Sequence, residues 1–158
     1  MGIVWATLES KRRLEARLAE LIASRGKAAQ DISTAREFGD LSENAEYAAA
    51  KEAQNNLENE IIKIQEMLGD IKLFNYQKCD TNSVNLGTKV ELINKSARNK
   101  KETVIITGVL ESDPTKDYIS NESPKGKALM GKKVGDIATL KVPAGLIRYE
   151  IVKISAGA

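Results

Sequence analysis

The feature that most constrains this chain is a pair of apolar stripes with the same spacing, separated by a short break at Gly39. Apolar residues that recur at alternating steps of three and four are typical of a helix that packs along its length against another helix. The first stripe contains Leu14, Leu18, Leu21, Ala28, Ile32 and Ala35, and the second contains Tyr47, Ala50, Leu57, Ile61, Ile64, Leu68 and Ile71.

Both stripes share one mirror point. If the chain folds back at residue 41, Leu21 faces Ile61 and the other stripe residues pair in the same way. We therefore predict an antiparallel coiled-coil hairpin with arms over roughly 8–38 and 43–74, each about 45 Å long at 1.5 Å per residue. Arg25 interrupts the first stripe beside Gly26, which weakens a helix by about 1 kcal/mol relative to Ala.

The second half of the chain changes to the alternating pattern of strands. Alternation over 88–93, 102–107, 138–142 and 147–152 predicts a small antiparallel β-sheet, and residues 123–131 predict a turn and a short helix. The stretch 94–102 holds four basic residues and indicates an exposed hairpin loop. The expected fold class is α+β, with a hairpin over 1–75, a linker over 76–83 and a sheet domain over 84–158.

The composition restricts the chemistry. The chain has no histidine and one cysteine, Cys79, so the commonest general base and a cysteine-based zinc site within one chain are excluded. Catalytic chemistry must then rest on carboxylates, which favour hard ions such as Mg²⁺. We read no signal peptide and no membrane span, and expect a cytoplasmic protein.

The net charge of +2 hides an asymmetry between the halves. Residues 1–75 hold 10 Lys/Arg against 13 Asp/Glu, which gives −3, and residues 76–158 hold 14 against 9, which gives +5. Neither value is large enough to establish nucleic-acid binding by itself.

The turn between the predicted helices carries two acids, Asp40 and Glu43. Their spacing resembles a capping box, with Asp40 as the N-cap, and acids are favoured at a helix N-terminus. Alternatively, the two carboxylates share a divalent cation with an outside partner, since two ligands are too few for a dedicated protein site. Spacing alone favours the capping role, although both roles can coexist.

Other side chains near the turn have simpler interpretations. Arg36 and Lys51 could meet phosphates, but each taken alone is typical of a solvated surface charge. Phe38, Leu41 and Tyr47 are expected to close a small apolar cluster under the turn.

Two runs carry a resemblance over nearly the whole chain. They are Ala35-Arg36-Glu37-Phe38-Gly39-Asp40-Leu41-Ser42-Glu43-Asn44-Ala45-Glu46-Tyr47 and Ile119-Ser120-Asn121-Glu122-Ser123-Pro124, the latter continued by 128–136. The chain resembles the bacterial Gre transcript cleavage factors, the GreA type in particular. The resemblance implies an FKBP-like second domain and a monomeric factor that binds RNA polymerase, with DNA binding as a further expectation.

The resemblance also implies a mechanism. The coiled coil would enter the secondary channel of RNA polymerase, where Asp40 and Glu43 help to hold Mg²⁺ jointly with the polymerase. The polymerase then hydrolyses backtracked RNA near its 3′ end, so the factor is not itself an enzyme and binds no Mg²⁺ tightly alone. By position, Arg36 and Lys51 lie near the RNA, and polymerase contacts are expected at Glu122, Ser123 and Pro124.

Two alternatives remain at this point. A channel-binding inhibitor would have the same architecture, but related inhibitors have altered tips, and the run from Gly39 to Asn44 is intact. A prolyl isomerase would need an aromatic pocket, and beyond the linker only Tyr118 and Tyr149 are available.

Overall fold

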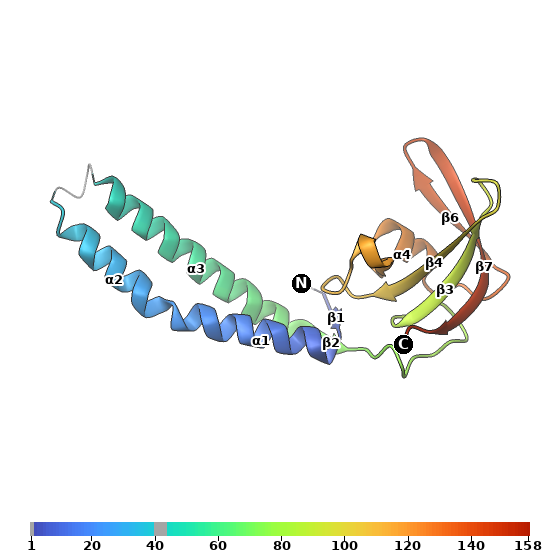
Figure 1. Ribbon diagram of the computed structural model, residues 1–158, viewed down its shortest axis with the longest axis horizontal. Helices are drawn as coiled ribbons and strands as arrows, with labels where there is room; N and C mark the ends of the chain where they lie inside the picture. The colour runs from blue at the N-terminus through green and yellow to red at the C-terminus, as the bar shows by residue number, and fades with distance from the viewer. Residues whose placement is uncertain (1, 40–43) are drawn as a thin grey trace. The chain divides into compact units, whose positions relative to one another are not determined.

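The computed structural model describes residues 2–39 and 44–158 (Figure 1). The chain divides into two compact units, one formed by residues 11–70 and the other by residues 1–10 and 71–158. The first is helical and the second is built around a β-sheet, so the predicted α+β class is confirmed. No helix among the described residues is long and apolar enough to cross a membrane.

The hairpin consists of α1 (Leu8–Ala23), α2 (Arg25–Arg36) and α3 (Ala45–Asp70). The first arm, predicted as one helix over 8–38, is interrupted at Ser24, two residues before Gly26. The Ser24 hydroxyl donates to the carbonyl of Glu20 at 3.0 Å, and such a bond back to the preceding turn often bends a helix. The helical ladder resumes at once, because the Ala28 N–H donates to the Ser24 carbonyl at 3.1 Å.

The seam between the arms follows the predicted register. Leu21, Ile61 and Ile64 are buried and form one cluster. Leu14, Leu18, Leu57 and Leu68 pack against it, so apolar residues of both predicted stripes meet in one cluster. The prediction of an antiparallel hairpin is therefore confirmed, while residue 41, the predicted mirror point, lies outside the described residues.

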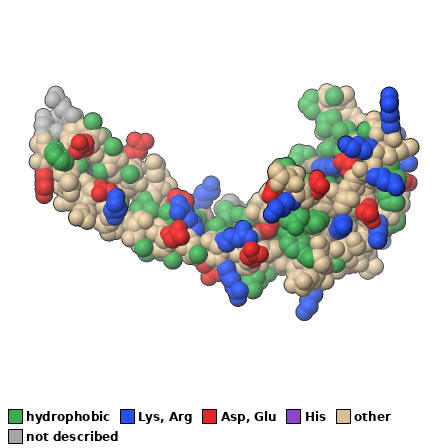
Figure 2. All heavy atoms as spheres, viewed as in Figure 1, with side chains coloured by type: hydrophobic (Ala, Val, Ile, Leu, Met, Phe, Trp, Pro, Cys, Tyr) green, Lys and Arg blue, Asp and Glu red, His purple; other side chains and the backbone are tan. Residues whose placement is uncertain are grey.

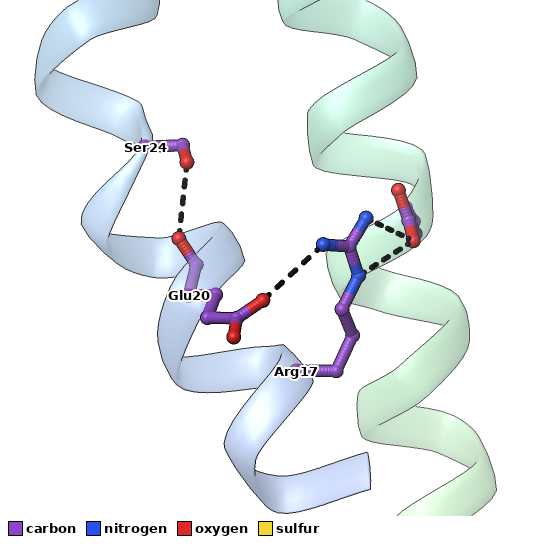
Figure 3. A network of polar contacts seen from close by, with 4 residues as sticks. Arg17, Glu20 and Ser24 are labelled. Carbon is purple, nitrogen blue, oxygen red and sulfur yellow. Dashed lines mark hydrogen bonds and ion pairs between the residues drawn. The ribbon is translucent and has the colours of Figure 1, made fainter. Parts of the chain in front are cut away.

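Charged side chains reinforce the seam from its exposed flanks. The Arg25 guanidinium donates to both carboxylate oxygens of Glu58, at 2.8 and 2.9 Å. Arg17 donates to Glu60 on α3 at 3.2 Å and to Glu20 on its own helix at 3.4 Å (Figure 3). The interruption of the first stripe at Arg25 thus provides a cross-helix ion pair.

The second unit is a five-stranded sheet in the order β5-β4-β3-β7-β6. All neighbouring strands are antiparallel except β5, which runs parallel to β4. The prediction missed β5, because three residues are too few to show alternation. The elements are β3 (Thr88–Asn94), β4 (Lys100–Thr107), a 3₁₀ turn η1 (Pro114–Lys116), β5 (Tyr118–Ser120), α4 (Pro124–Leu129), β6 (Ile137–Val142) and β7 (Gly145–Ala156).

One face of this sheet carries the core. Its buried side chains are Val84, Val90, Leu92, Val104, Ile106, Leu129, Ala138, Tyr149 and Ile151, to which α4 contributes Leu129. The β3–β4 turn, residues 95–99, is exposed as predicted, but the loop predicted over 94–102 was too long, because Asn94 ends β3 and residues 100–102 belong to β4.

Two short strands that the sequence did not predict belong to the same unit. β1 (Val4–Ala6) pairs in parallel with β2 (Ile71–Leu73). The chain passes very close to Gly108, where any side chain would overlap the carbonyl oxygen of Trp5. Tyr76, within the predicted linker, packs its ring 6.0 Å from that of Tyr118 on β5.

Candidate functional site

The hairpin end lies between the last residue of α2, Arg36, and the first residue of α3, Ala45. The predicted metal ligands, Asp40 and Glu43, lie outside the described residues. Gly39 has a φ of 112°, a conformation that glycine adopts without strain, but the first arm ends earlier than predicted, with Arg36 as its last helical residue and Glu37 as its C-cap.

Asn44 holds the base of the hairpin end together. Its side-chain oxygen accepts a hydrogen bond from the Tyr47 N–H at 3.0 Å, as an N-cap does. Its side-chain nitrogen donates to the carbonyl of Ala35 at 2.6 Å, on the other arm. The cap of α3 is therefore Asn44 rather than Asp40, so the capping alternative no longer explains the acid at position 40. Sequence reasoning missed Asn44, although an asparagine just before a helix is a recognised signal.

The two predicted cations meet at Tyr47. The Arg36 guanidinium lies 5.7 Å from the centre of the Tyr47 ring. A hydrogen bond from Arg36, together with the positive charges of Arg36 and Lys51, lowers the pKa of the Tyr47 phenol. The structure thus gathers Arg36 and Lys51, 15 positions apart in the sequence, at one place near the hairpin end.

Phe38 departs from its prediction. Its side chain is 67% exposed, so it does not close an apolar cluster with Tyr47. The polar contacts of Asn44 take the place expected for apolar packing, because they join the two arms directly. Leu41, the third residue of the predicted cluster, lies outside the described residues.

A second candidate surface is the loop before α4. The Ser123 hydroxyl caps this helix by accepting from the Gly126 N–H at 3.0 Å, and it donates to the Ser120 carbonyl at 2.6 Å. The Glu122 N–H donates to the Ser120 hydroxyl oxygen at 3.0 Å. Any side chain at Gly126 would overlap the Ser120 carbonyl, so the loop is closely fitted. Glu122 and Pro124 remain exposed on it.

Elsewhere among the described residues, two buried polar groups lack a hydrogen-bond partner. Neither carboxylate oxygen of Glu111 forms a hydrogen bond, and the same is true of the Tyr76 hydroxyl. Burial, with the nearby charge of Glu111, raises the pKa of Tyr76. Within residues 2–39 and 44–158, no three His, Cys, Asp or Glu side chains are grouped so that they could hold a metal ion.

Comparison with protein families covers both units. Residues 4–73 match the family model described as "Transcription elongation factor, N-terminal", and residues 79–156 match "Transcription elongation factor, GreA/GreB, C-term". The chain belongs to the GreA/GreB family. The resemblance read from the two sequence runs is therefore confirmed, and this GreA/GreB protein is a transcription elongation factor.

Two relatives named as transcription elongation factor GreA agree with this assignment. The chain is 42% identical over 154 residues to transcription elongation factor GreA of Amoebophilus asiaticus, which covers 97% of this chain and 98% of that protein. It is 40% identical over 149 residues to transcription elongation factor GreA of Thermoanaerobacter pseudethanolicus, with 94% of each chain covered. A crystal structure of GreA factor homolog 1 from Thermus thermophilus matches at 25% identity with a TM-score of 0.43, covering 97% of this chain and 99% of that one.

Proposed function

We propose that this GreA/GreB factor enters the secondary channel of RNA polymerase and stimulates the polymerase's own hydrolysis of backtracked RNA. The observation that carries the proposal is the run from Ala35 to Tyr47, located at the turn of an antiparallel hairpin in a chain of this family. Arrested complexes would be rescued, because cleavage creates a new RNA 3′ end in the polymerase active site.

In this proposal, Asp40 and Glu43 hold Mg²⁺ jointly with carboxylates of the polymerase. The donor set fits this ion, since carboxylate oxygens are its preferred protein ligands and one or two of them are usual. Bound there, Mg²⁺ supplies charge stabilisation for attack on the phosphodiester. The assignment of the cap to Asn44 supports the proposal, because it leaves these acids without a role as the N-cap of α3.

The length of the hairpin supports its proposed entry into a channel. The 26 residues of α3 extend about 39 Å at 1.5 Å per residue. Arg36 and Lys51, held beside Tyr47, would meet phosphates of the RNA near its 3′ end. The closely fitted loop of Glu122, Ser123 and Pro124 would contact the polymerase and anchor the factor.

The decisive experiment adds the protein and Mg²⁺ to backtracked elongation complexes and follows the release of short 3′ RNA fragments. We expect Asp40→Ala and Glu43→Ala each to abolish stimulated cleavage while binding to polymerase is largely kept. Glu52→Ala is the matched control, since it removes an exposed acid from α3 and should cleave normally. Normal cleavage by both tip variants would show that the metal assignment is wrong. If the wild-type protein bound the polymerase without any cleavage, the alternative function of a channel-binding inhibitor would be favoured.

A companion measurement tests the docking loop. Pro124→Ala should weaken polymerase binding, because Pro124 is exposed at the first position of α4. Pro143→Ala, at an exposed position in the β6–β7 turn, should leave the affinity unchanged. Equal affinity of both variants would move the docking surface elsewhere.

A further inference from the structure

The sheet has a second face, opposite its core, that the proposed function does not use. Side chains of directly paired residues lie on the same face of a sheet. Lys101 pairs with Ile93, Ile93 pairs with Glu150, and Glu150 pairs with Ile137, so these residues share one face across four strands. The neighbouring residues Leu92 and Ile151 point to the other face, into the core. We refer to the face of Lys101 and Glu150 as the outer face.

The outer face is strongly basic. Following the alternation along each strand, it carries two acids, Glu91 and Glu150. The Lys95 ammonium lies 3.5 Å from Glu150, so one positive charge is already paired. The Arg98 side chain in the exposed β3–β4 turn adds to the excess, and Lys and Arg side chains gather around this turn in Figure 2. The cations of the face, all exposed, are Lys89, Lys95, Lys101, Lys141, Arg148 and Lys153.

The spacing of these cations suits a nucleic-acid duplex. Arg148 on β7 lies two strand spacings across and two residues along from Lys101 on β4, or about 12 Å at roughly 4.8 Å per spacing and 3.4 Å per residue. The major groove of B-DNA is about 12 Å wide, so cations on these strands can meet phosphates on both sides of it. Lys141 on β6 lies one strand spacing beyond Arg148 and two residues further along the strands.

The side chains that are absent from this face also matter. The described outer-face positions carry no aromatic residue, and proteins that bind single strands rely on aromatic stacking. Protein interfaces usually centre on a buried aromatic or arginine anchor in an apolar pocket, whereas nucleic-acid affinity is supplied largely by phosphate contacts. The excess of positive charge, without aromatic side chains, therefore favours a phosphate backbone.

We propose that the outer face of the sheet, through Lys101, Lys141 and Arg148, binds the phosphate backbone of a nucleic-acid duplex without reading its sequence. The resemblance to Gre factors assigns no residue to such contacts. The inference goes beyond the proposed function, since it uses neither Asp40 and Glu43 nor the loop of Glu122 to Pro124.

The test measures binding of the full chain to a fluorescent DNA duplex of mixed sequence over a range of salt concentrations. Each lost phosphate contact should reduce the slope of log Kd against log salt by about 0.9. The triple variant Lys101→Gln, Lys141→Gln, Arg148→Gln should therefore lower the slope by about 2 to 3 and raise Kd at low salt by roughly tenfold or more. Its thermal unfolding should match that of wild type, because all three side chains are exposed.

A matched control separates a specific face from net charge. The variant Lys116→Gln, Lys127→Gln, Lys133→Gln removes the same charge from exposed positions of the same unit outside the outer face, and should bind within twofold of wild type. An equal loss of duplex affinity in both triple variants would overturn the proposal. It would also be overturned if wild type failed to bind the duplex, bound a single strand more tightly, or bound only polyglutamate, which would indicate an acidic protein partner.

Discussion

In the described part of the hairpin, the buried seam cluster has three side chains, Leu21, Ile61 and Ile64, with partly buried leucines beside it, whereas nine buried side chains form the core of the sheet unit. The hairpin also carries ion pairs at its surface, such as that between Arg25 and Glu58. Exposed ion pairs contribute little, typically less than about 1 kcal/mol each. The comparison teaches that the hairpin depends on a few apolar contacts, and that its free energy of unfolding should be sensitive to each of them.

The largest expected effect on the free energy of unfolding comes from truncating one buried side chain in each unit. Ile61 and Leu92 are both fully buried, and replacing either by Ala should cost about 2 to 5 kcal/mol. We expect Ile61→Ala to accelerate amide hydrogen exchange throughout α1 to α3 and to leave the sheet amides protected. Leu92→Ala should accelerate exchange of the sheet amides and leave the amides of α1 to α3 protected. The measurement is native-state hydrogen exchange, which resolves local unfolding.

The neighbouring position provides the control for this pair. Ile62 is 50% exposed on the same helix, and Ile62→Ala should change the stability by no more than about 0.5 kcal/mol. If Ile61→Ala and Leu92→Ala each accelerated exchange equally in both units, the two units would unfold together and the contrast between them would not hold.

An intermediate effect is expected where the hairpin uses polar contacts instead of apolar ones. Asn44→Ala removes both the cap of α3 and the bond to Ala35, and should cost about 1 to 2 kcal/mol. Exchange should quicken at Tyr47 first. Transcript cleavage should fall as well if the acids depend on this support.

Two further variants separate the contacts of Asn44. Asn44→Asp keeps an acceptor for the Tyr47 N–H but cannot donate to Ala35, so it should retain the cap and lose only the contact between the arms. Asn55→Ala, at an exposed position of α3, should have little effect. Unchanged exchange in Asn44→Ala would show that the hairpin end does not need this side chain.

Much of the fold could be predicted because the hairpin and the longer strands have regular periods. The mirror relation placed Leu21 against Ile61 without structural information, since both apolar stripes obey one register. The strands β1, β2 and β5 have three residues each, which is too short for alternation to be recognised. Their pairing depends on close approaches, such as that of Trp5 to Gly108, which no local pattern encodes.

The candidate site was predictable to a smaller extent. Their positions in the motif indicated Arg36 and Lys51 as candidate RNA-binding residues. Only the folded hairpin shows that both lie near Tyr47. The cap was placed at Asp40 because a capping box depends on spacing, and the sequence offers several acceptable caps near one helix start. The prediction that Phe38 is buried was wrong. It rested on apolar character alone, whereas in the structure the contacts of Asn44 join the two arms and Phe38 stays exposed.

The smallest expected effects come from the ion pairs of the two units. Lys125 lies 2.9 Å from Glu102 in the sheet unit, with both side chains about a quarter exposed or less. Arg25 lies 2.8 Å from Glu58 in the hairpin, with both more than 40% exposed. Because burial reduces screening, Glu102→Gln should cost about 1 kcal/mol at neutral pH, and Glu58→Gln less than about 0.5 kcal/mol.

The pH dependence of unfolding distinguishes the pairs further. Burial opposes ionisation of Glu102, but the hydrogen bond and charge of Lys125 outweigh it and lower the pKa of this carboxyl below its ordinary 4.5. A carboxyl with a lowered pKa in the folded state stabilises the fold above about pH 4.5, and the contribution is lost as the pH falls through the folded-state pKa. The difference in denaturant midpoint between wild type and Glu102→Gln should therefore be present at pH 7 and shrink toward pH 3. If the difference in denaturant midpoint stayed constant from pH 7 to pH 3, Glu102→Gln would destabilise the fold through lost packing. The ion pair of the sheet unit would then contribute no more to stability than the ion pair of the hairpin does.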